Sequence, residues 1–519
     1  YFILRKIAQL SISHLSYLWY NYFVKCLNYF KYQYTHGIAC VETEIKMAFG
    51  FFKKAETADL IFHNGHIYTQ DHALPWADAV ACIGDKILGV GSLDGMDEII
   101  DEHTQLVDLD GKFLFPGFID AHRSPVLKVF DGRFIDLSEC FSPEDILDAV
   151  AEWAEDNPED EIIFGYGYSE NLKPEDTEDN PFASAEFLSE ACVERPVLLL
   201  CASGVDCWTN RAADEIIAST AEEEYVQTIT VAYVLNLLIP FDFEQIEEDV
   251  KQEIEDLADH GFTSVLNLGT PDYFESLYQD SIIGLYNEGE IRQRFFGSYY
   301  MNRPLVPKPL IKRLMNRKTT CLELNGVLNA NMLNLYLDNA NCPVPFSQDA
   351  LNTILAEVSD KNFDIFVEAV DREDMLMAYD AFEFIRAKGY KNNFVIASDY
   401  TLTAEEASIR SSSSEVIATC GTNLLSDRSI YSHAASAEDV INELTINAAR
   451  IIGVQDSLGS IKSGMLADFA IFDENPLDCE IKLIPRLHAC MTVLSGNIVY
   501  DAENENDMEM FTLMMSQQY

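Results

Sequence analysis

Cysteine thiols are the first groups in this chain that could do metal or redox chemistry. The 519 residues include 12 cysteines, which are scattered from Cys26 to Cys490 without a CxxC pair. Several lie inside apolar runs, such as Val80-Ala81-Cys82-Ile83 and Leu199-Leu200-Cys201-Ala202. A thiolate metal site or a dithiol redox centre needs cysteines at short spacing. We therefore interpret these cysteines as reduced, buried and small apolar residues.

Histidines could ligate a metal or transfer a proton, and the chain has 10 of them. The sequence around His433 and His488 contains no motif that indicates a site. Four others fall in the region that we assign below to a β-sandwich, and we expect them at the surface. These are His63, His66, His72 and His103.

Charge excludes two classes of partner. The formal charge of −51 at pH 7 comes from 86 acidic residues against 35 basic ones. Because nucleic acids and anionic membranes carry charge of the same sign, they are repelled, and we expect neither as a partner. We interpret the acidic excess as a solvated surface suited to a salty or crowded cytoplasm, where we expect this protein, rather than as a dedicated cation site.

Residues 1–46 differ in composition from the rest of the chain. They contain no methionine, are rich in aromatic residues such as Tyr17–Phe23, and carry more basic than acidic residues. A signal anchor is one interpretation, because Ala8–Val24 is free of charged residues and follows Arg5-Lys6, but polar residues interrupt this stretch. We favour the interpretation that translation starts at Met47 and that residues 1–46 are an upstream extension outside the native protein. They are left out of the fold prediction.

Both ends of the remaining chain predict antiparallel β structure. Asn64-Gly65 and Gly84-Asp85 each lie between two short apolar runs, a pattern typical of β-hairpins. Similar runs recur near the C-terminal end. We therefore expect residues 58–112 and 459–503 to form one composite β-sandwich. The candidate strands are 59–63, 66–69, 79–83, 86–90, 467–472, 491–494 and 498–500.

Between these ends, near-continuous apolar runs alternate with helical patterns. Ser142-Pro143-Glu144-Asp145 and Ser436-Ala437-Glu438-Asp439 indicate helix starts, and Gly261, Gly389 and Gly453 indicate helix ends. This alternation over residues 113–458 predicts an α/β fold: a (β/α)8 TIM-like barrel first, and a doubly wound open sheet second. The candidate strands are 113–120, 161–167, 196–202, 263–268, 294–300, 321–328, 363–370, 394–398 and 416–420.

Three local motifs resemble the amidohydrolase superfamily. They are Leu109–His122, which includes Pro116-Gly117-Phe118-Ile119-Asp120-Ala121-His122, then His260–Val265, and Leu444–Arg450 followed by Gly459–Phe469. The resemblance extends from about Ala58 to Tyr500 and is strongest to amidohydrolase family 3, which includes N-substituted formamide deformylase. It implies a distorted barrel beside the sandwich, with one or two divalent ions, typically zinc, at the C-terminal ends of the strands.

The chain departs from the ligand set that this resemblance implies. Where the family has two histidines as HxH, this chain has His122-Arg123-Ser124, and the guanidinium of Arg123 opposes a dication. Glu368 replaces a histidine after the fifth barrel strand, and Ser398 replaces one after the sixth. Two further expected groups are also absent. A lysine is missing from 319–326, with Lys318 out of register, and a substrate-side histidine is missing from Ser203–Trp208.

The surviving candidates are His122 as a metal ligand and Asp427, on the eighth strand, as a metal ligand and catalytic residue. Two ligands are too few for tight zinc binding. We therefore expect no resident cofactor, with zinc required if the protein is active, and a leftover role for His122 as a hydrogen-bonding residue. An oxygen-rich site for magnesium or calcium remains the alternative; it would use Glu368, Asp371, Asp399 and Asp427.

Two functions follow from these departures. The favoured hypothesis is an amidohydrolase-family protein that has lost most metal ligands, is catalytically impaired or inactive, and binds a small molecule. The alternative is an active metal-dependent hydrolase of non-peptide C–N bonds with a rebuilt, carboxylate-rich site. A scaffold protein that uses its acidic surface is a third hypothesis, but no motif supports it.

Overall fold

The computed structural model describes residues 56–123, 129, 132–138, 140–201, 206–220, 231–238, 242–269, 272–321, 327–340, 344–398, 418–419 and 434–503. Glu98–Asp101 group with the segment before Ala58, and the strands and helices discussed below belong to the other compact unit, Ala58–Asp97 with Glu102–Tyr519. No helix within the described ranges is long and apolar enough to cross a membrane.

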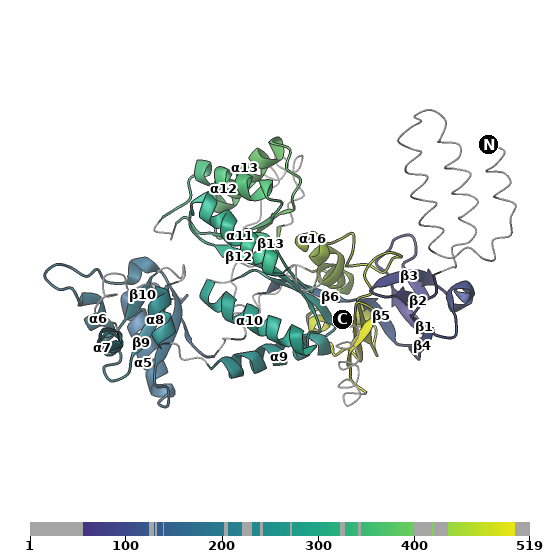
Figure 1. The fold of residues 1–519 in the computed structure, drawn as a ribbon, viewed down its shortest axis with the longest axis horizontal. Coiled ribbons are helices and arrows are strands. Elements are labelled where there is room, and N and C mark those ends of the chain that lie inside the picture. The colour runs from purple at the N-terminus through teal and green to yellow at the C-terminus, as the bar shows by residue number, and fades with distance from the viewer. Residues whose placement is uncertain are drawn as a thin grey trace, which may run out of the picture. The chain divides into compact units, whose positions relative to one another are not determined.

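Strands from both ends of the chain form one sheet of eight strands, in the order β19-β18-β17-β5-β1-β2-β3, with β4 paired to β1 (Figure 1). The two ends meet where β5 pairs antiparallel with β17. The strands are β1 (Leu60–Tyr68), β2 (Trp76–Ile83), β3 (Lys86–Gly91), β4 (Gln105–Asp108), β5 (Phe113–Pro116), β17 (Phe469–Phe472), β18 (Met491–Leu494) and β19 (Asn497–Asp501).

The hairpin predicted at Asn64-Gly65 is wrong, because these residues lie inside the single strand β1. The pairing of β1 with β2 shifts register between His63 and Ile67, and Asn64 has φ 58°. On its other edge, β1 pairs with β4 before this irregularity and with β5 after it. An Asn-Gly pair accommodates a positive φ in a bulge as well as in a turn. The bulge bends β1 at the point where its pairing changes from β4 to β5. The hairpin predicted at Gly84-Asp85 is confirmed, since β2 and β3 flank it.

Gly117 separates two strands that the sequence predicts as one run over 113–120. β5 ends at Pro116 in the eight-stranded sheet, and β6 (Phe118–Arg123) belongs to a second, parallel sheet. A Cβ at Gly117 would lie 2.2 Å from Oγ1 of Thr263. A glycine is therefore needed where the chain passes from one sheet to the other.

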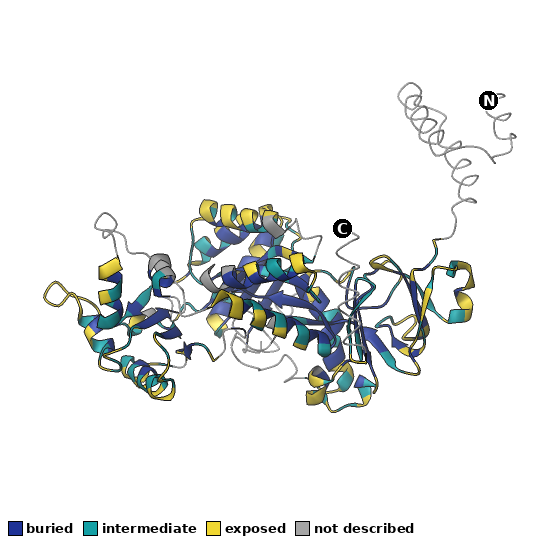
Figure 2. Cartoon of the chain, turned by 60° about the horizontal axis from the view of Figure 1, so that its bottom comes forward, coloured by how far each residue is buried: buried dark blue, intermediate teal, exposed yellow. Residues whose placement is uncertain are grey.

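The second sheet has seven strands, all paired in parallel, in the order β16-β15-β14-β13-β12-β11-β6. Its interior strands are almost fully buried, as Figure 2 shows. Parallel strands covered on both faces are the basis of (β/α) barrels. Besides β6, the strands are β11 (Phe262–Asn267), β12 (Arg294–Met301), β13 (Leu328–Leu337), β14 (Asp364–Ala369), β15 (Phe394–Ala397) and β16 (Ala418–Thr419).

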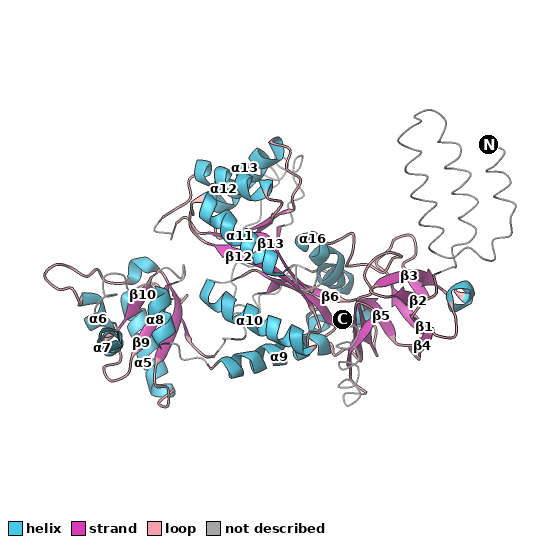
Figure 3. Cartoon of the chain, viewed as in Figure 1, coloured by secondary structure: helices cyan, strands magenta, loops and turns pink. Residues whose placement is uncertain are grey.

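Helices alternate with these strands and cover the sheet (Figure 3). On one face, α11 (Pro307–Cys321), α12 (Gln348–Asp360) and α13 (Arg372–Ala387) bury a core with apolar side chains of β12–β15. On the other face, α16 (Ala448–Ile452) packs against Ala121, Met332 and Phe366. The remaining helices next to this sheet are α9 (Phe243–Asp259) and α10 (Asp272–Glu288).

A smaller sheet of four strands has the order β10-β9-β8-β7, with β10 antiparallel to β9. It comprises β7 (Ile135–Asp136), β8 (Ile163–Tyr168), β9 (Val197–Cys201) and β10 (Cys207–Thr209). Helix α5 (Pro143–Asp156) begins as predicted, because Ser142 and Asp145 form a capping box. The other helices of this region are α6 (Ala183–Leu188), α7 (Arg211–Thr220) and α8 (Val231–Leu238).

Most of the strand predicted over 321–328 lies outside the described residues, and its two described ends do not belong to one strand. Helix α11 continues to Cys321, and β13 begins only at Leu328. The asparagines at 329, 331 and 334 make the β13 sequence look like a loop, although Asn334 is completely buried. Closure of the parallel strands into one (β/α)8 barrel stays a prediction.

Candidate functional site

Four polar side chains lie on one face of the parallel sheet, near the C-terminal ends of three adjacent strands. Tyr300 of β12 is in register with Asn334 of β13, and Tyr336 of β13 is in register with Glu368 of β14. Residues in register on neighbouring strands share a face, as do residues two apart on one strand. This face also carries Met332 and Phe366, which face α16. In parallel α/β folds, ligands bind at this end of the strands.

Glu368 and Asn334 form a buried hydrogen-bonded pair at the centre of this group. Both side chains have no exposed surface. Nδ2 of Asn334 donates to Oε1 of Glu368 at 2.6 Å and to the carbonyl of Leu268 at 2.8 Å. Oε2 of Glu368 and Oδ1 of Asn334 have no hydrogen-bond partner in the described part of the chain. Two buried acceptors are thus left open, which is costly unless a proton or a ligand satisfies them.

Burial raises the pKa of Glu368 to about 7, although the hydrogen bond from Asn334 acts in the opposite direction. The carboxyl group therefore holds its proton over most of the acidic range and is partly neutral near neutral pH. A protonated carboxyl group can donate one hydrogen bond as well as accept. Glu368 is accordingly suited to recognise a polar group rather than to carry a fixed negative charge.

Two tyrosines supply hydroxyl groups beside this pair. The rings of Tyr300 and Tyr336 are 6.4 Å apart. Burial, together with neighbouring phenols and Glu368, raises the pKa of Tyr300, and burial with nearby Asp338 and Glu368 raises that of Tyr336. Both phenols stay neutral at physiological pH, so each can donate or accept a hydrogen bond.

The structure places only part of the predicted site. His122 lies in β6, which ends at Arg123. Ser398 follows β15 and is 3% exposed. Ser124, Asp399 and Asp427 lie outside the described residues, so their predicted roles stay predictions.

Asp371 has a structural role. Its Oδ1 accepts a hydrogen bond from the backbone N–H of Asp374 at 2.9 Å and caps α13. A carboxylate that caps a helix N-terminus is oriented toward the backbone amides. This contact explains Asp371 without a metal, and the oxygen-rich magnesium or calcium site stays a prediction.

Two of these positions do not carry the imidazole ligands that the family resemblance implies for zinc. Tight binding needs about three nitrogen, thiolate or carboxylate ligands. The positions that are expected to carry histidine on β14 and after β15 carry Glu368 and Ser398 instead. Glu368 would have to lose its proton before it could bind a metal, and a serine hydroxyl is not a ligand of structural or catalytic zinc sites.

Lys318 lies on helix α11, where its Nζ contacts Asn331 and lies 4.8 Å from the ring centroid of Phe363. Phe363 belongs to the core between the sheet and helices α11–α13, on the face opposite to Glu368. Lys318 is therefore not a substitute for the lysine that the family resemblance implies.

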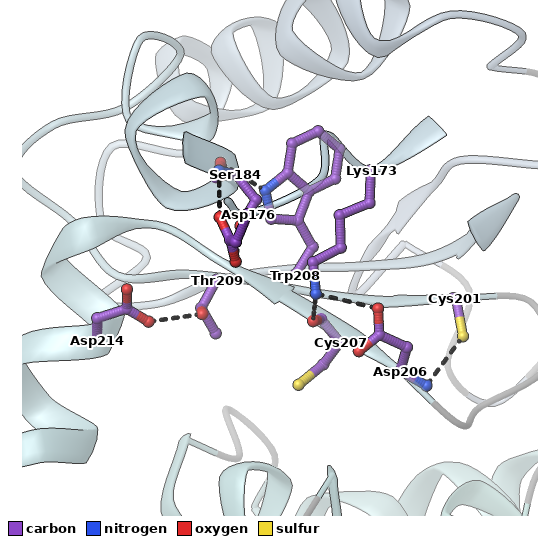
Figure 4. A network of polar contacts seen from close by, with 9 residues as sticks. All are labelled: Lys173, Asp176, Ser184, Cys201, Asp206, Cys207, Trp208, Thr209 and Asp214. Atoms are coloured by element: carbon purple, nitrogen blue, oxygen red, sulfur yellow. Dashed lines mark hydrogen bonds and ion pairs between the residues drawn. The ribbon is translucent and has the colours of Figure 1, made fainter. Parts of the chain in front are cut away.

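A histidine that the family resemblance implies is missing from Ser203–Trp208. Asp206 and Trp208, at the end of this segment, belong to a network of polar contacts (Figure 4). Lys173 Nζ donates to Asp206 Oδ2 at 3.0 Å, and Trp208 Nε1 donates to the carbonyl of Ser184 at 2.8 Å. The charged and polar groups of Asp206 and Trp208 therefore have protein partners. They fix strand β10 in its sheet.

Among the described cysteines, Cys82 and Cys201 are buried as predicted, whereas Cys140, Cys192, Cys207, Cys479 and Cys490 are only partly buried. Cys82, Cys201 and Cys490 are free thiols. Burial, together with nearby Asp59, raises the pKa of Cys82 to about 12. A thiol that holds its proton this firmly is neither a nucleophile nor a metal ligand at neutral pH.

The sequence prediction missed Asn334, Tyr300 and Tyr336 as site residues. The available signal was the polar alternation of Asn334 and Tyr336 within an apolar run, which is typical of a strand end that carries function. Because the strand itself was placed at 321–328, these residues were not assigned to a strand end.

Comparison with known proteins identifies one family. The model of the amidohydrolase family matches residues 105–409 and 423–500. The exoenzymes regulatory protein AepA of Pectobacterium carotovorum is 22% identical over 382 residues, which cover 65% of this chain and 79% of that protein. Protein LONG AFTER FAR-RED 3 of Arabidopsis thaliana is 28% identical over 174 residues, which cover 33% of this chain and only 29% of that protein.

Two solved structures share the fold at low sequence identity. An uncharacterised metal-dependent hydrolase from Pyrococcus furiosus superposes with a TM-score of 0.51 at 17% identity, and the match covers 81% of this chain and 100% of that one. An adenosine deaminase from Xanthomonas campestris with bound zinc gives a TM-score of 0.50 at 13% identity, over 89% and 98% of the two chains. These likenesses indicate a TIM-barrel-type hydrolase fold of mixed α/β content.

Proposed function

The chain belongs to the amidohydrolase family, and from this premise we propose that it is a degenerate member that binds a small molecule without metal-dependent hydrolysis. The proposal includes a complete (β/α)8 barrel, a composite β-sandwich built from residues 58–112 and 459–503, and a cytoplasmic location. The acidic charge and the free thiols support the location.

The observation that carries the proposal is the buried pair Asn334–Glu368. Glu368 stands where the resemblance implies a histidine ligand, and it bonds to an amide of the neighbouring strand at 2.6 Å. Burial favours its neutral form. A side chain in this state can bind a polar group of a ligand, but it is a poor substitute for an imidazole at a dication.

The chemistry of the open positions indicates the kind of ligand. Oδ1 of Asn334 is an acceptor, Oε2 of Glu368 accepts when the carboxyl group is ionised and donates when it is protonated, and Tyr300 and Tyr336 carry hydroxyl groups on the same face of the sheet. A small neutral molecule with an amide N–H would satisfy the acceptors, and its carbonyl could accept from a phenol. This is the amide-like chemistry that amidohydrolases act on, retained here for binding.

Ligand-observed NMR with N-methylformamide tests this proposal. N,N-Dimethylformamide is the matched control, because it has the same carbonyl but no N–H donor. We expect saturation transfer to N-methylformamide only, and we expect Glu368→Ala and Asn334→Ala to abolish it. Release of formate at a rate that depends on added metal would refute the proposal, and so would equal transfer to both probes.

A further inference from the structure

A second group of candidate metal ligands lies away from the polar site. Asp259 is the last residue of α9, His260 caps that helix, and His488 lies in the segment before β18. One possible ligand atom from each of the three lies within 4.8 Å of those of the other two. The imidazole rings of His260 and His488 are 4.8 Å apart. Two residues adjacent in sequence thus meet one from the opposite end of the chain.

The hydrogen bonds of these residues prepare them for metal binding. Nδ1 of His260 lies 2.7 Å from the carbonyl oxygen of Asp256. Because a carbonyl oxygen only accepts, this Nδ1 carries the proton and Nε2 keeps its lone pair. Nδ1 of His488 lies 2.6 Å from Oδ2 of Asp259, and the hydroxyl of Tyr500 donates to Oδ1 of Asp259 at 2.7 Å. A bond to a backbone carbonyl, as at His260, is how proteins orient histidine ligands.

Backbone contacts hold the two segments together independently of any ion. The N–H of Ala489 donates to the carbonyl of Asp259 at 2.6 Å, and Oγ1 of Thr492 donates to the carbonyl of Ala258 at 2.7 Å. The Cα positions of the three candidate ligands are therefore fixed by buried structure. The side chain of His488 is 73% exposed, which leaves it free to move.

We propose that Asp259, His260 and His488 bind a divalent transition metal of the zinc class. Two imidazoles and one carboxylate are a common protein ligand set for zinc, with water at the fourth position. Ligand atoms at ~2.0–2.2 Å from one zinc ion are at most ~4.4 Å apart, so a small movement of His488 closes the site. The ion would lie at a helix C-terminus in a strongly acidic chain, and both features favour a cation.

This site is structural. Helix α9 leads into the start of β11 at Phe262, so the three residues lie at the opposite end of that strand from its C-terminal edge. The polar site formed by Glu368 and Asn334 belongs to the C-terminal edge of the sheet. An ion bound here would connect α9 to β18 and β19 of the eight-stranded sheet, and it would stabilise that connection.

Zinc titration of the full chain by isothermal calorimetry, after treatment with a chelator, tests the inference. We expect one saturable site that is lost in His260→Ala and in His488→Ala, and a rise in melting temperature with zinc that both variants lack. His72→Ala is the matched control, because His72 is exposed and distant in sequence from the cluster. It should bind zinc as the wild type does.

Cobalt substitution supplies a second readout that does not depend on stability. A tetrahedral cobalt site gives visible absorption bands, which we expect in the wild type and in His72→Ala but not in His488→Ala. No saturable zinc binding would show that His488 and Asp259 form an ion pair only, and the inference would be overturned. A different result would contradict the proposed function: His260→Ala and His488→Ala both still bind zinc, but His122→Ala does not.

Discussion

Nδ2 of Asn334 donates to Oε1 of Glu368 at 2.6 Å, between neighbouring parallel strands and without exposure to solvent. This contact places a carboxyl group with a raised pKa where the family resemblance implies an imidazole. The proposed loss of metal chemistry and the proposed polar binding site would therefore have the same structural cause. Each property can be tested separately.

Glu368→Gln should stabilise the protein at pH 8 by about 1–3 kcal/mol. The pKa of Glu368 is raised from its model-compound value of 4.5 to about 7 in the folded state. Above pH 7 both states are ionised, and the folded state bears the cost of a buried charge. As the pH falls from 7 towards 4.5, the folded state takes up its proton first, so this cost disappears. The advantage of glutamine should therefore shrink over that range, as measured by urea denaturation.

Burial also raises the pKa values of Asp364 and Asp374 to about 6. Both residues are present in the wild type and in Glu368→Gln, so their contributions cancel when the two free energies of unfolding are subtracted. Glu368→Ala is the control, because it removes the charge and also removes one of the two acceptors of Asn334 Nδ2. We expect it to be less stable than Glu368→Gln at every pH. If the difference in unfolding free energy between Glu368→Gln and the wild type does not change between pH 4.5 and 8, Glu368 is not a buried acid.

Restoring two imidazoles should restore metal affinity. The double variant Ser124→His with Glu368→His supplies nitrogen ligands beside His122, and three ligands are enough for zinc. We expect the zinc affinity measured by competition with a chromophoric chelator to rise at least ~10-fold over that of either single variant, which corresponds to about 1.4 kcal/mol. An unchanged affinity in the double variant would refute the alignment of these positions with the family ligands.

A buried ion pair joins the two large sheets. Nε and a terminal nitrogen of Arg294, at the start of β12, donate to Asp468 beside β17 at 2.8 and 3.0 Å. The two side chains are only 8% and 2% exposed. Asp468→Ala leaves a buried guanidinium unpaired and should destabilise the protein by about 3–5 kcal/mol in denaturant unfolding. Asp360→Ala removes an exposed pair with Lys361 and should change stability by less than about 0.5 kcal/mol. Equal losses of stability in the two variants would show that the buried Arg294–Asp468 pair stabilises the protein no more than an exposed pair does.

Gly117→Ala should lower the free energy of unfolding by about 1–3 kcal/mol, because Gly117 lies where the chain passes from one sheet to the other. A Cβ there would lie 2.2 Å from Thr263 Oγ1 and 2.5 Å from its methyl carbon, within a buried strand. Gly91→Ala, which meets nothing within 4 Å, is the control and should be nearly neutral in thermal unfolding. Thr263→Ala should partly rescue Gly117→Ala. Absence of rescue would show that the clash is not with Thr263.

Local signals in the sequence predicted several elements well. Ser142 and Ser436 cap helices as predicted, since each side chain accepts a hydrogen bond from the backbone N–H three residues further along the chain. Gly453 ends α16 with φ 83°, as expected for a helix C-terminus. Asn64-Gly65 was misread because a bulge and a hairpin both use its positive φ. Only the pairing of β1 with its neighbours distinguishes them, and pairing is not a local property.

The site was harder to predict than the fold. Glu368 was found because it occupies a motif position, but its partner Asn334 lies on another strand, 34 residues away. His488 and Asp259 are separated by 229 residues, and no motif surrounds His488. Contacts of this kind arise from the tertiary fold, so composition and spacing cannot reveal them.

The zinc content of the double variant His260→Ala with His488→Ala tests most directly whether the barrel has lost its metal. This variant lacks the proposed structural ligands, so any ion that it retains must lie elsewhere. After purification from zinc-supplemented medium, elemental analysis should find only traces of zinc or manganese. Near-stoichiometric metal that disappears on addition of His122→Ala would contradict the loss of the catalytic metal site.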